Sequence, residues 1–158
     1  MLYSFFEWLE ASPLGVFVKD QAATFAIIEA AHLLGLALLG GSVLAQDLRL
    51  LNVIMRDVPS NVVTEQAHRW FKVGLSVLLI TGVPMLAGVA TKCYHNPFYW
   101  TKMIALAIGI LFVFTLKQPL LRGDHAALKP ITLKLMALAS MSLWFLVAAS
   151  GRWIGFSG

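Results

Sequence analysis

The sequence predicts an all-α integral membrane protein, an up-down bundle of four transmembrane helices preceded by an interfacial amphipathic helix. Of its 158 residues, 59% are hydrophobic and only 13% are charged, and the mean hydropathy is +0.78. A soluble domain carries roughly a quarter charged residues. The apolar residues also fall in blocks of about twenty, which is the length that a bilayer demands. Lys and Arg stand at the ends of these blocks, a distribution that favours a lipid bilayer as the partner and argues against nucleic acid.

Residues 1–20 are predicted to form an interfacial segment in front of a single transmembrane domain over residues 21–158. An apolar stripe at helical spacing runs along its first part: Leu2, Phe5, Phe6 and Leu9. Trp8 is suited to anchor this stripe at the membrane surface. Ser12 and Pro13 then have the residue types of an N-cap and a first helical position, so a second short helix is expected to begin there.

Four apolar blocks predict membrane spans at residues 22–48, 70–90, 98–119 and 131–150. Pro84 interrupts the second block, where a proline removes one helical hydrogen bond and can kink the helix. Two helical hairpins are the simplest way to connect the four spans. The single cysteine, Cys93, excludes an intrachain disulfide framework.

The basic residues predict the orientation in the membrane. Eight belong to the side that holds the connections after the first and third spans: Arg49, Arg56, Arg69, Lys72, Lys117, Arg122, Lys129 and Lys134. Four belong to the opposite side: Lys19, Lys92, Lys102 and Arg152. Because cytoplasmic connections carry the excess of Lys and Arg, both termini are expected on the outer, periplasmic side.

Glu29 and His32 are the polar residues that stand out, because they lie inside the first apolar block. Residues three apart share one face of a helix, and ionisable residues in hydrocarbon are costly enough to indicate a functional site. A stripe at 100° per residue continues from this pair: Glu29, His32, Leu36, Gly40, Val43 and Asp47. Gly40 on this stripe would leave space for another helix or for a flat ligand.

The depth of each histidine limits which residues can share a ligand. His32 is expected about 10–15 Å from the outer end of its span, at a rise of 1.5 Å per residue. Met85 is expected at a similar depth, and His95 in the short outer connection. His68 and His125 belong to the cytoplasmic side, so His32 and His68 should be on the order of 20 Å apart along the membrane normal. That separation is too large for one metal ion.

These residues predict a haem b site in the outer half of the bundle, in a protein that transfers electrons or acts as a redox or accessory subunit. His32 would be an axial ligand, with Met85, His95, a group from another subunit or no residue as the second. Lys102 and Arg152 would hold the propionates. Glu29 would orient the imidazole or relay protons. Trp144 would either stack on the cofactor or pack in the core.

Two alternatives remain open. Copper handling would use soft and imidazole ligands, namely Met85, His95 and His32 with Cys93; Cys93 and His68 are the weaker metal-ligand candidates. A non-catalytic assembly subunit would instead use its polar residues only for helix packing, with Glu29 bonded to Lys102 or Arg152.

A series of short motifs also runs the length of the chain. In order they are Ser12-Pro13-Leu14-Gly15, Ile28 to Gly35, Asp47 to Leu51, Thr81-Gly82, Asn96-Pro97-Phe98, Lys102-Met103, Trp144 and Gly151-Arg152. This series resembles a bacterial family of small four-span inner-membrane proteins of unknown function, which is distantly similar to copper-resistance D type proteins and to b-type membrane cytochromes. The resemblance implies a bacterial inner-membrane protein, and the haem interpretation adds that it would be a homo-oligomer or a subunit of a membrane redox complex. It marks as family positions Glu29, His32, Asp47, Arg49, Lys102 and Arg152.

Overall fold

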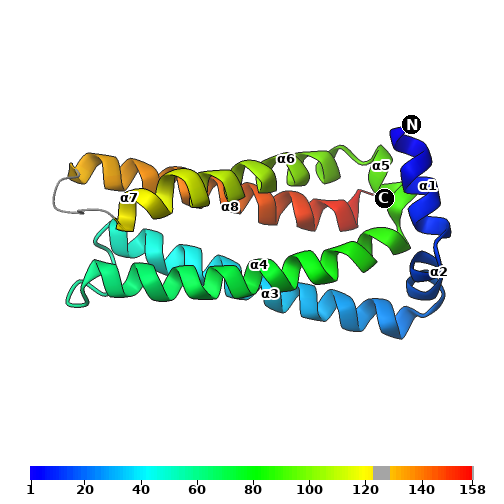
Figure 1. The fold of residues 1–158 in the computed structure, drawn as a ribbon, viewed down its shortest axis with the longest axis horizontal. Helices are drawn as coiled ribbons and strands as arrows, with labels where there is room; N and C mark the ends of the chain where they lie inside the picture. The colour runs from blue at the N-terminus through cyan, green and yellow to red at the C-terminus, as the bar shows by residue number, and fades with distance from the viewer. Residues whose placement is uncertain (123–128, 158) are drawn as a thin grey trace.

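Helices are the regular secondary structure of the chain over the residues that the computed structural model describes, 1–122 and 129–157, and the longest non-helical connection among them is 51–59. His125 lies outside these residues. The helices are α1 (Leu2–Ala11), α2 (Pro13–Asp20), α3 (Ala22–Leu50), α4 (Ser60–Gly88), α5 (Ala90–His95), α6 (Pro97–Leu111), the π-helix η1 (Phe112–Lys117), α7 (Gln118–Arg122) and α8 (Pro130–Phe156). Both chain ends lie at one end of the bundle, called here the outer end (Figure 1). The α3–α4 connection lies at the other, inner end.

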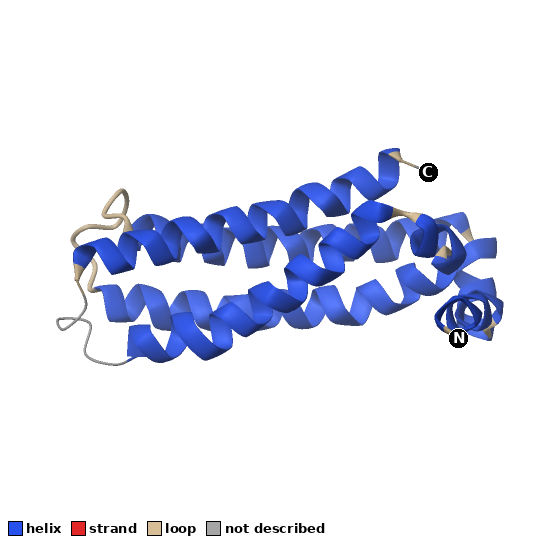
Figure 2. Ribbon diagram, turned by 90° about the horizontal axis from the view of Figure 1, so that it is seen from above, coloured by secondary structure: helices blue, strands red, loops and turns tan. Residues whose placement is uncertain are grey.

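Four stretches within the described residues are long and apolar enough to cross a membrane: α3, α4, the continuous run Pro97–Arg122, and α8. They lie side by side along the long axis of the molecule (Figure 2). This arrangement confirms the predicted all-α membrane bundle. Two of the helices are longer than the spans expected from the sequence: α3 and α4 each have 29 residues. At a rise of about 1.5 Å per residue each is about 44 Å long, whereas the hydrocarbon core of a bilayer is about 30 Å thick.

The largest difference from the expected bounds is in α4, which begins at Ser60 and not near residue 70. Residues 60–69 are too polar to count as membrane span, yet Val63, Ala67 and Phe71 are buried at helical spacing. Residues 60–69 therefore form an amphipathic part of the helix, which extends α4 beyond the apolar block. At the other end α4 continues through Pro84 to Gly88.

α3 and α4 pack closely because two glycines face each other. A Cβ atom on Gly74 would lie 2.7 Å from the Leu39 backbone nitrogen, and one on Gly35 would lie 2.8 Å from Val77 Cγ1. Small residues permit such backbone approach between membrane helices. Gly40, predicted to leave space beside α3, does so: no atom lies within 4 Å of its Cβ position.

The second hairpin, α6–η1–α7 with α8, packs on the first through α3 and α8. A shared hydrophobic core fills the space between the hairpins; its buried residues are Leu39, Val43, Phe71, Leu75, Ala105, Val113, Trp144 and Val147. Trp144 occupies the position opened by Gly109, where a Cβ would lie 3.2 Å from the Trp144 ring.

The N-terminal segment forms the two predicted helices, and they lie across the outer end of the bundle (Figure 1). Ser12 caps α2 by accepting a hydrogen bond from the Gly15 backbone N–H at 3.1 Å, and Pro13 takes the first turn. α1 packs on α5 and α2 on α4. A Cβ on Gly15 would lie 2.9 Å from the Ala87 carbonyl oxygen, so the segment is in close contact with the bundle.

Candidate functional site

His32 is half-buried on α3 and is held by α4. Its Nδ1 lies 2.8 Å from Thr81 Oγ1, and the Thr81 hydroxyl lies 2.6 Å from the Val77 carbonyl oxygen. A carbonyl can only accept, so the one hydroxyl proton of Thr81 goes to Val77 and the imidazole Nδ1–H must donate to Thr81. This network assigns the neutral ring its Nδ1–H tautomer and leaves the Nε2 lone pair available.

One glycine lies beside this imidazole, and a second glycine lies beside Lys102. A Cβ on Gly82 would lie 3.5 Å from His32 Cε1. Lys102 of α6 packs along Gly151 of α8, where a Cβ would lie 3.5 Å from Lys102 Nζ. The ammonium is within electrostatic range of His32. The four residues come from four helices: His32 from α3, Gly82 from α4, Lys102 from α6 and Gly151 from α8.

Glu29 and Arg152, by contrast, are exposed on the outside of the bundle. The Arg152 guanidinium lies 4.5 Å from the centre of the Phe156 ring. Among the described residues the ion pairs are Lys19–Glu10 and Lys117–Asp47, so Glu29 bonds neither Lys102 nor Arg152. A polar network built on Glu29 is not what joins these helices.

The copper-type ligands lie on different surfaces. Cys93 is buried among Phe6, Ala90 and Tyr99, and this burial raises the pKa of its thiol. His95 is exposed, donates from Nδ1 to the Thr91 carbonyl at 3.0 Å and meets the Tyr3 ring edge-on at 5.5 Å. Met85 is half-buried on α4. No three His, Cys, Asp or Glu side chains within residues 1–122 and 129–157 come close enough to hold one metal ion.

A second polar group, missed by the sequence analysis, lies in the inner half. Lys117 Nζ is 2.6 Å from Asp47 Oδ1 and 3.0 Å from Ser140 Oγ, and all three residues are fully buried. The sequence-based prediction of orientation counted Lys117 among the eight basic residues on the cytoplasmic side. That assignment is wrong, because Lys117 is buried inside the bundle. The available signal was the predicted third span itself, because a helix that continues to residue 119 includes Lys117.

Lys117 is the last residue of the π-helix η1. A π-helix inserts extra backbone into a turn and changes which side chains face inward. Here Val113 near the start of η1 and Lys117 at its end are both buried, and Gln118, the first residue of α7, is buried after them. Such a change of face cannot be seen in the hydropathy of the sequence.

Several other buried polar atoms of the inner half have no hydrogen-bond partner among the described residues: Gln46 Nε2, Asp47 Oδ2, His68 Nδ1 and Gln118 Oε1. Trp144 Nε1, within the hydrophobic core, also has none. Trp144 meets Phe71 edge-on at 5.3 Å between ring centres. Buried polar atoms nearly always have a hydrogen-bond partner. The inner half therefore contains more buried polar atoms than the Lys117–Asp47 ion pair and its hydrogen bond to Ser140 use.

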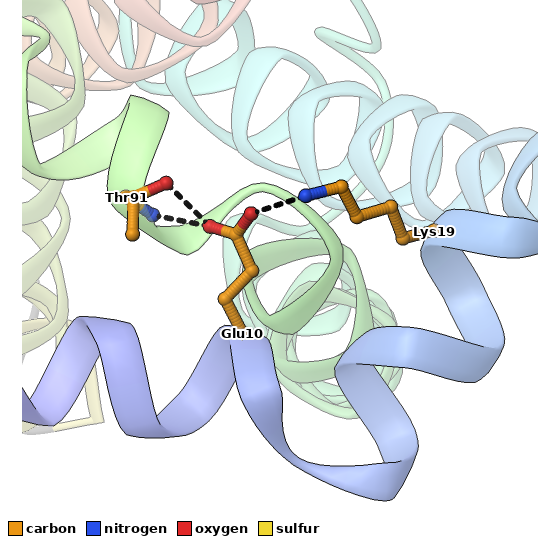
Figure 3. Close-up of polar contacts among 3 residues, drawn as sticks. All are labelled: Glu10, Lys19 and Thr91. Carbon is orange, nitrogen blue, oxygen red and sulfur yellow. Dashed lines mark hydrogen bonds and ion pairs between the residues drawn. The ribbon is translucent and has the colours of Figure 1, made fainter.

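At the outer end, Glu10 joins α1 and α2 to α5 (Figure 3). Glu10 Oε2 accepts from the Thr91 backbone N–H at 2.8 Å and from its hydroxyl at 2.6 Å, and Oε1 pairs with Lys19 Nζ at 2.6 Å. The Lys19 ammonium, helped by Thr91, lowers the pKa of the Glu10 carboxyl to about 2. The role of this group is to fix the N-terminal segment.

A comparison with known protein families identifies the family of the chain. The model described as Family of unknown function (DUF6644) matches residues 5–157. The chain belongs to this family. No curated protein and no solved structure matches it.

The DUF6644 match covers both polar groups, from His32 in the outer half to Lys117 in the inner half. It confirms the predicted membership of a family of unknown function. The similarity to copper-resistance D type proteins and to b-type membrane cytochromes stays a prediction.

Proposed function

We propose that this DUF6644 protein binds haem b in the outer half of its bundle and transfers electrons, with His32 as an axial ligand. The observation that carries the proposal is the hydrogen bond from His32 Nδ1 to Thr81 Oγ1 at 2.8 Å. Metal-bound histidines commonly donate their second ring N–H in this way, which fixes the tautomer and the ring orientation. The Nε2 lone pair is then the free ligand atom.

Several residues around His32 support the proposal. Gly82 and Gly151 are the small residues beside His32 and Lys102. Lys102 supplies a positive charge for a propionate, and the apolar helices supply the low-polarity surroundings. Met85, one helical turn beyond Thr81, is the protein ligand for the second axial position; otherwise that position belongs to another subunit or stays open.

The proposal places the protein in the bacterial inner membrane with its termini in the periplasm, as a homo-oligomer or a subunit of a redox complex. Seven of the eight inner-end cations still favour that orientation once the buried Lys117 is set aside. The haem site would then be in the periplasmic half.

An absorption spectrum of the full-length protein, purified in detergent from haem-replete cells, tests the proposal. We expect a Soret band in the wild type that is lost in His32→Ala and retained in His95→Ala, since His95 is exposed on α5. Monomer size and helix content establish that each variant is folded. A folded wild type without a Soret band contradicts the proposal; copper found in its place would favour copper handling, and the absence of any cofactor would favour an assembly subunit.

A further inference from the structure

A cavity of about 330 Å³ lies at the inner end of the bundle, away from His32. Five of its lining residues come from α4 and one from α7; they are Glu65, Gln66, His68, Arg69, Lys72 and Arg122. Positions 65, 68, 69 and 72 recur at helical spacing, so this face of α4 points into one cavity. We call it the α4–α7 cavity.

The α4–α7 cavity carries an excess of positive charge. Arg69, Lys72 and Arg122 contribute three positive charges and Glu65 one negative charge, which leaves two with His68 neutral. Glu65 takes part in none of the ion pairs that the described residues form. The positive charges are thus not neutralised by the one carboxylate of the cavity.

His68 provides a buried polar group in the same cavity. It is 7% exposed, and its Nδ1 has no hydrogen-bond partner among the described residues. Phe71 lies parallel to its ring at 6.5 Å between centres, and Phe114 meets it edge-on at 5.7 Å. The ring is therefore held in place with one nitrogen unpaired, although buried polar groups normally have a partner.

We propose that the α4–α7 cavity binds a phosphoryl group, held by Arg69, Lys72 and Arg122 and by a hydrogen bond from His68. Arginine and lysine are the side chains that bind phosphate oxygens most effectively. The group comes either from the headgroup of an anionic phospholipid or from free phosphate.

Two features next to the cavity favour the lipid as its source. Trp70 follows Arg69 directly and is 50% exposed, as tryptophans at the level of lipid headgroups are. An apolar groove of about 500 Å³ between α3 and α4 includes Trp70 and shares Gln66 with the cavity, so it can take an acyl chain of the same molecule. Basic pockets between transmembrane helices are known to bind such headgroups.

The proposal is tested by measuring which phospholipids stay bound to the purified protein. The full-length protein is exchanged into mixed micelles with equal amounts of phosphatidylglycerol and phosphatidylcholine, and native mass spectrometry counts the lipids that stay bound. We expect the wild type to prefer phosphatidylglycerol and Arg69→Gln/Lys72→Gln to lose about fivefold in that preference for each charge removed. Glu65→Gln should raise it. All three residues are exposed, so the variants are expected to fold.

The matched control is Lys134→Gln, because Lys134 is exposed on α8 at the same end but does not line the cavity. It should keep the wild-type preference, whereas a general effect of net charge would lower it. A second arm adds inorganic phosphate to lipid-free micelles: thermal stabilisation that disappears in Arg69→Gln/Lys72→Gln assigns free phosphate as the source. Equal lipid preference in the wild type and the double variant, without stabilisation by phosphate, overturns the proposal.

Discussion

The Lys117 ammonium lies 2.6 Å from the Asp47 carboxylate, and neither residue is exposed. The pair joins η1 to α3 and, through the hydroxyl of Ser140, to α8. It is therefore a buried polar connection between the two helical hairpins.

Removing one partner of this pair should destabilise the bundle strongly. Lys117→Ala or Asp47→Ala leaves the other charge buried without its counterpart, and each should lower the free energy of unfolding by about 3–5 kcal/mol. Replacing both, as in Asp47→Ala/Lys117→Ala, should cost less than the sum of the single changes. SDS titration of the purified protein measures these differences, with Lys134→Ala as the control. Additive losses would show that the two residues do not interact.

The contact between α3 and α4 predicts opposite results for two glycines of the first hairpin. Gly74→Ala places a methyl group 2.7 Å from the Leu39 backbone nitrogen, and overpacking of this kind costs about 1–3 kcal/mol. Gly40→Ala meets no atom within 4 Å, so its effect should be neutral or, through helix propensity, a gain of up to about 1 kcal/mol. Thermal unfolding of the two variants side by side checks the prediction, and equal midpoints would contradict it.

Attachment of the N-terminal helices should depend on pH through Glu10. Its pKa is about 2 in the folded protein against an ordinary 4.5, so its contribution is complete above pH 4.5 and is lost as the pH falls towards 2. Protease cleavage between α1 and α2 should therefore speed up over this range in the wild type. Glu10→Gln should be cleaved faster even at neutral pH and should lack this part of the pH dependence, whereas Glu7→Gln should behave as the wild type.

Thr81 should affect a bound haem through His32 without being a ligand itself. Thr81→Val removes the oxygen that accepts the Nδ1 proton, and loss of such an outer partner typically lowers metal affinity 10–100-fold. Thr81→Ser keeps the hydroxyl and should restore binding. Haem titration followed at the Soret band gives the affinities. If Val and Ser give the same affinity, the hydrogen bond does not orient the ligand.

The fold could be predicted because its causes are local. Three of these causes can be read directly from the sequence: the apolar blocks of bilayer length, Ser12 before Pro13, and the positions of the charged residues. The start of α4 was missed because residues 60–69 are amphipathic, and hydropathy alone recognises only the apolar part of a helix.

The site was harder to predict than the fold because it depends on contacts between distant residues. The sequence could give the depth of His32 in its helix, but helical spacing could not show that Glu29 is exposed. Thr81 as the partner of His32 requires the register of α3 against α4, which the facing glycines Gly35 and Gly74 set. Lys117 lies in a π-helix, and its ion pair with Asp47 depends on how the second hairpin packs on α3.

The hydrogen bonds from Thr91 to Glu10 join residues 81 positions apart in the chain. Synthesis proceeds from the N-terminus, so α1 and α2 leave the ribosome well before α5 exists. These first helices can make the contact with Thr91 only after α3 and α4 have both been synthesised. Their docking therefore closes the assembly of the first hairpin, and a truncation before Thr91 would leave them without their main polar anchor.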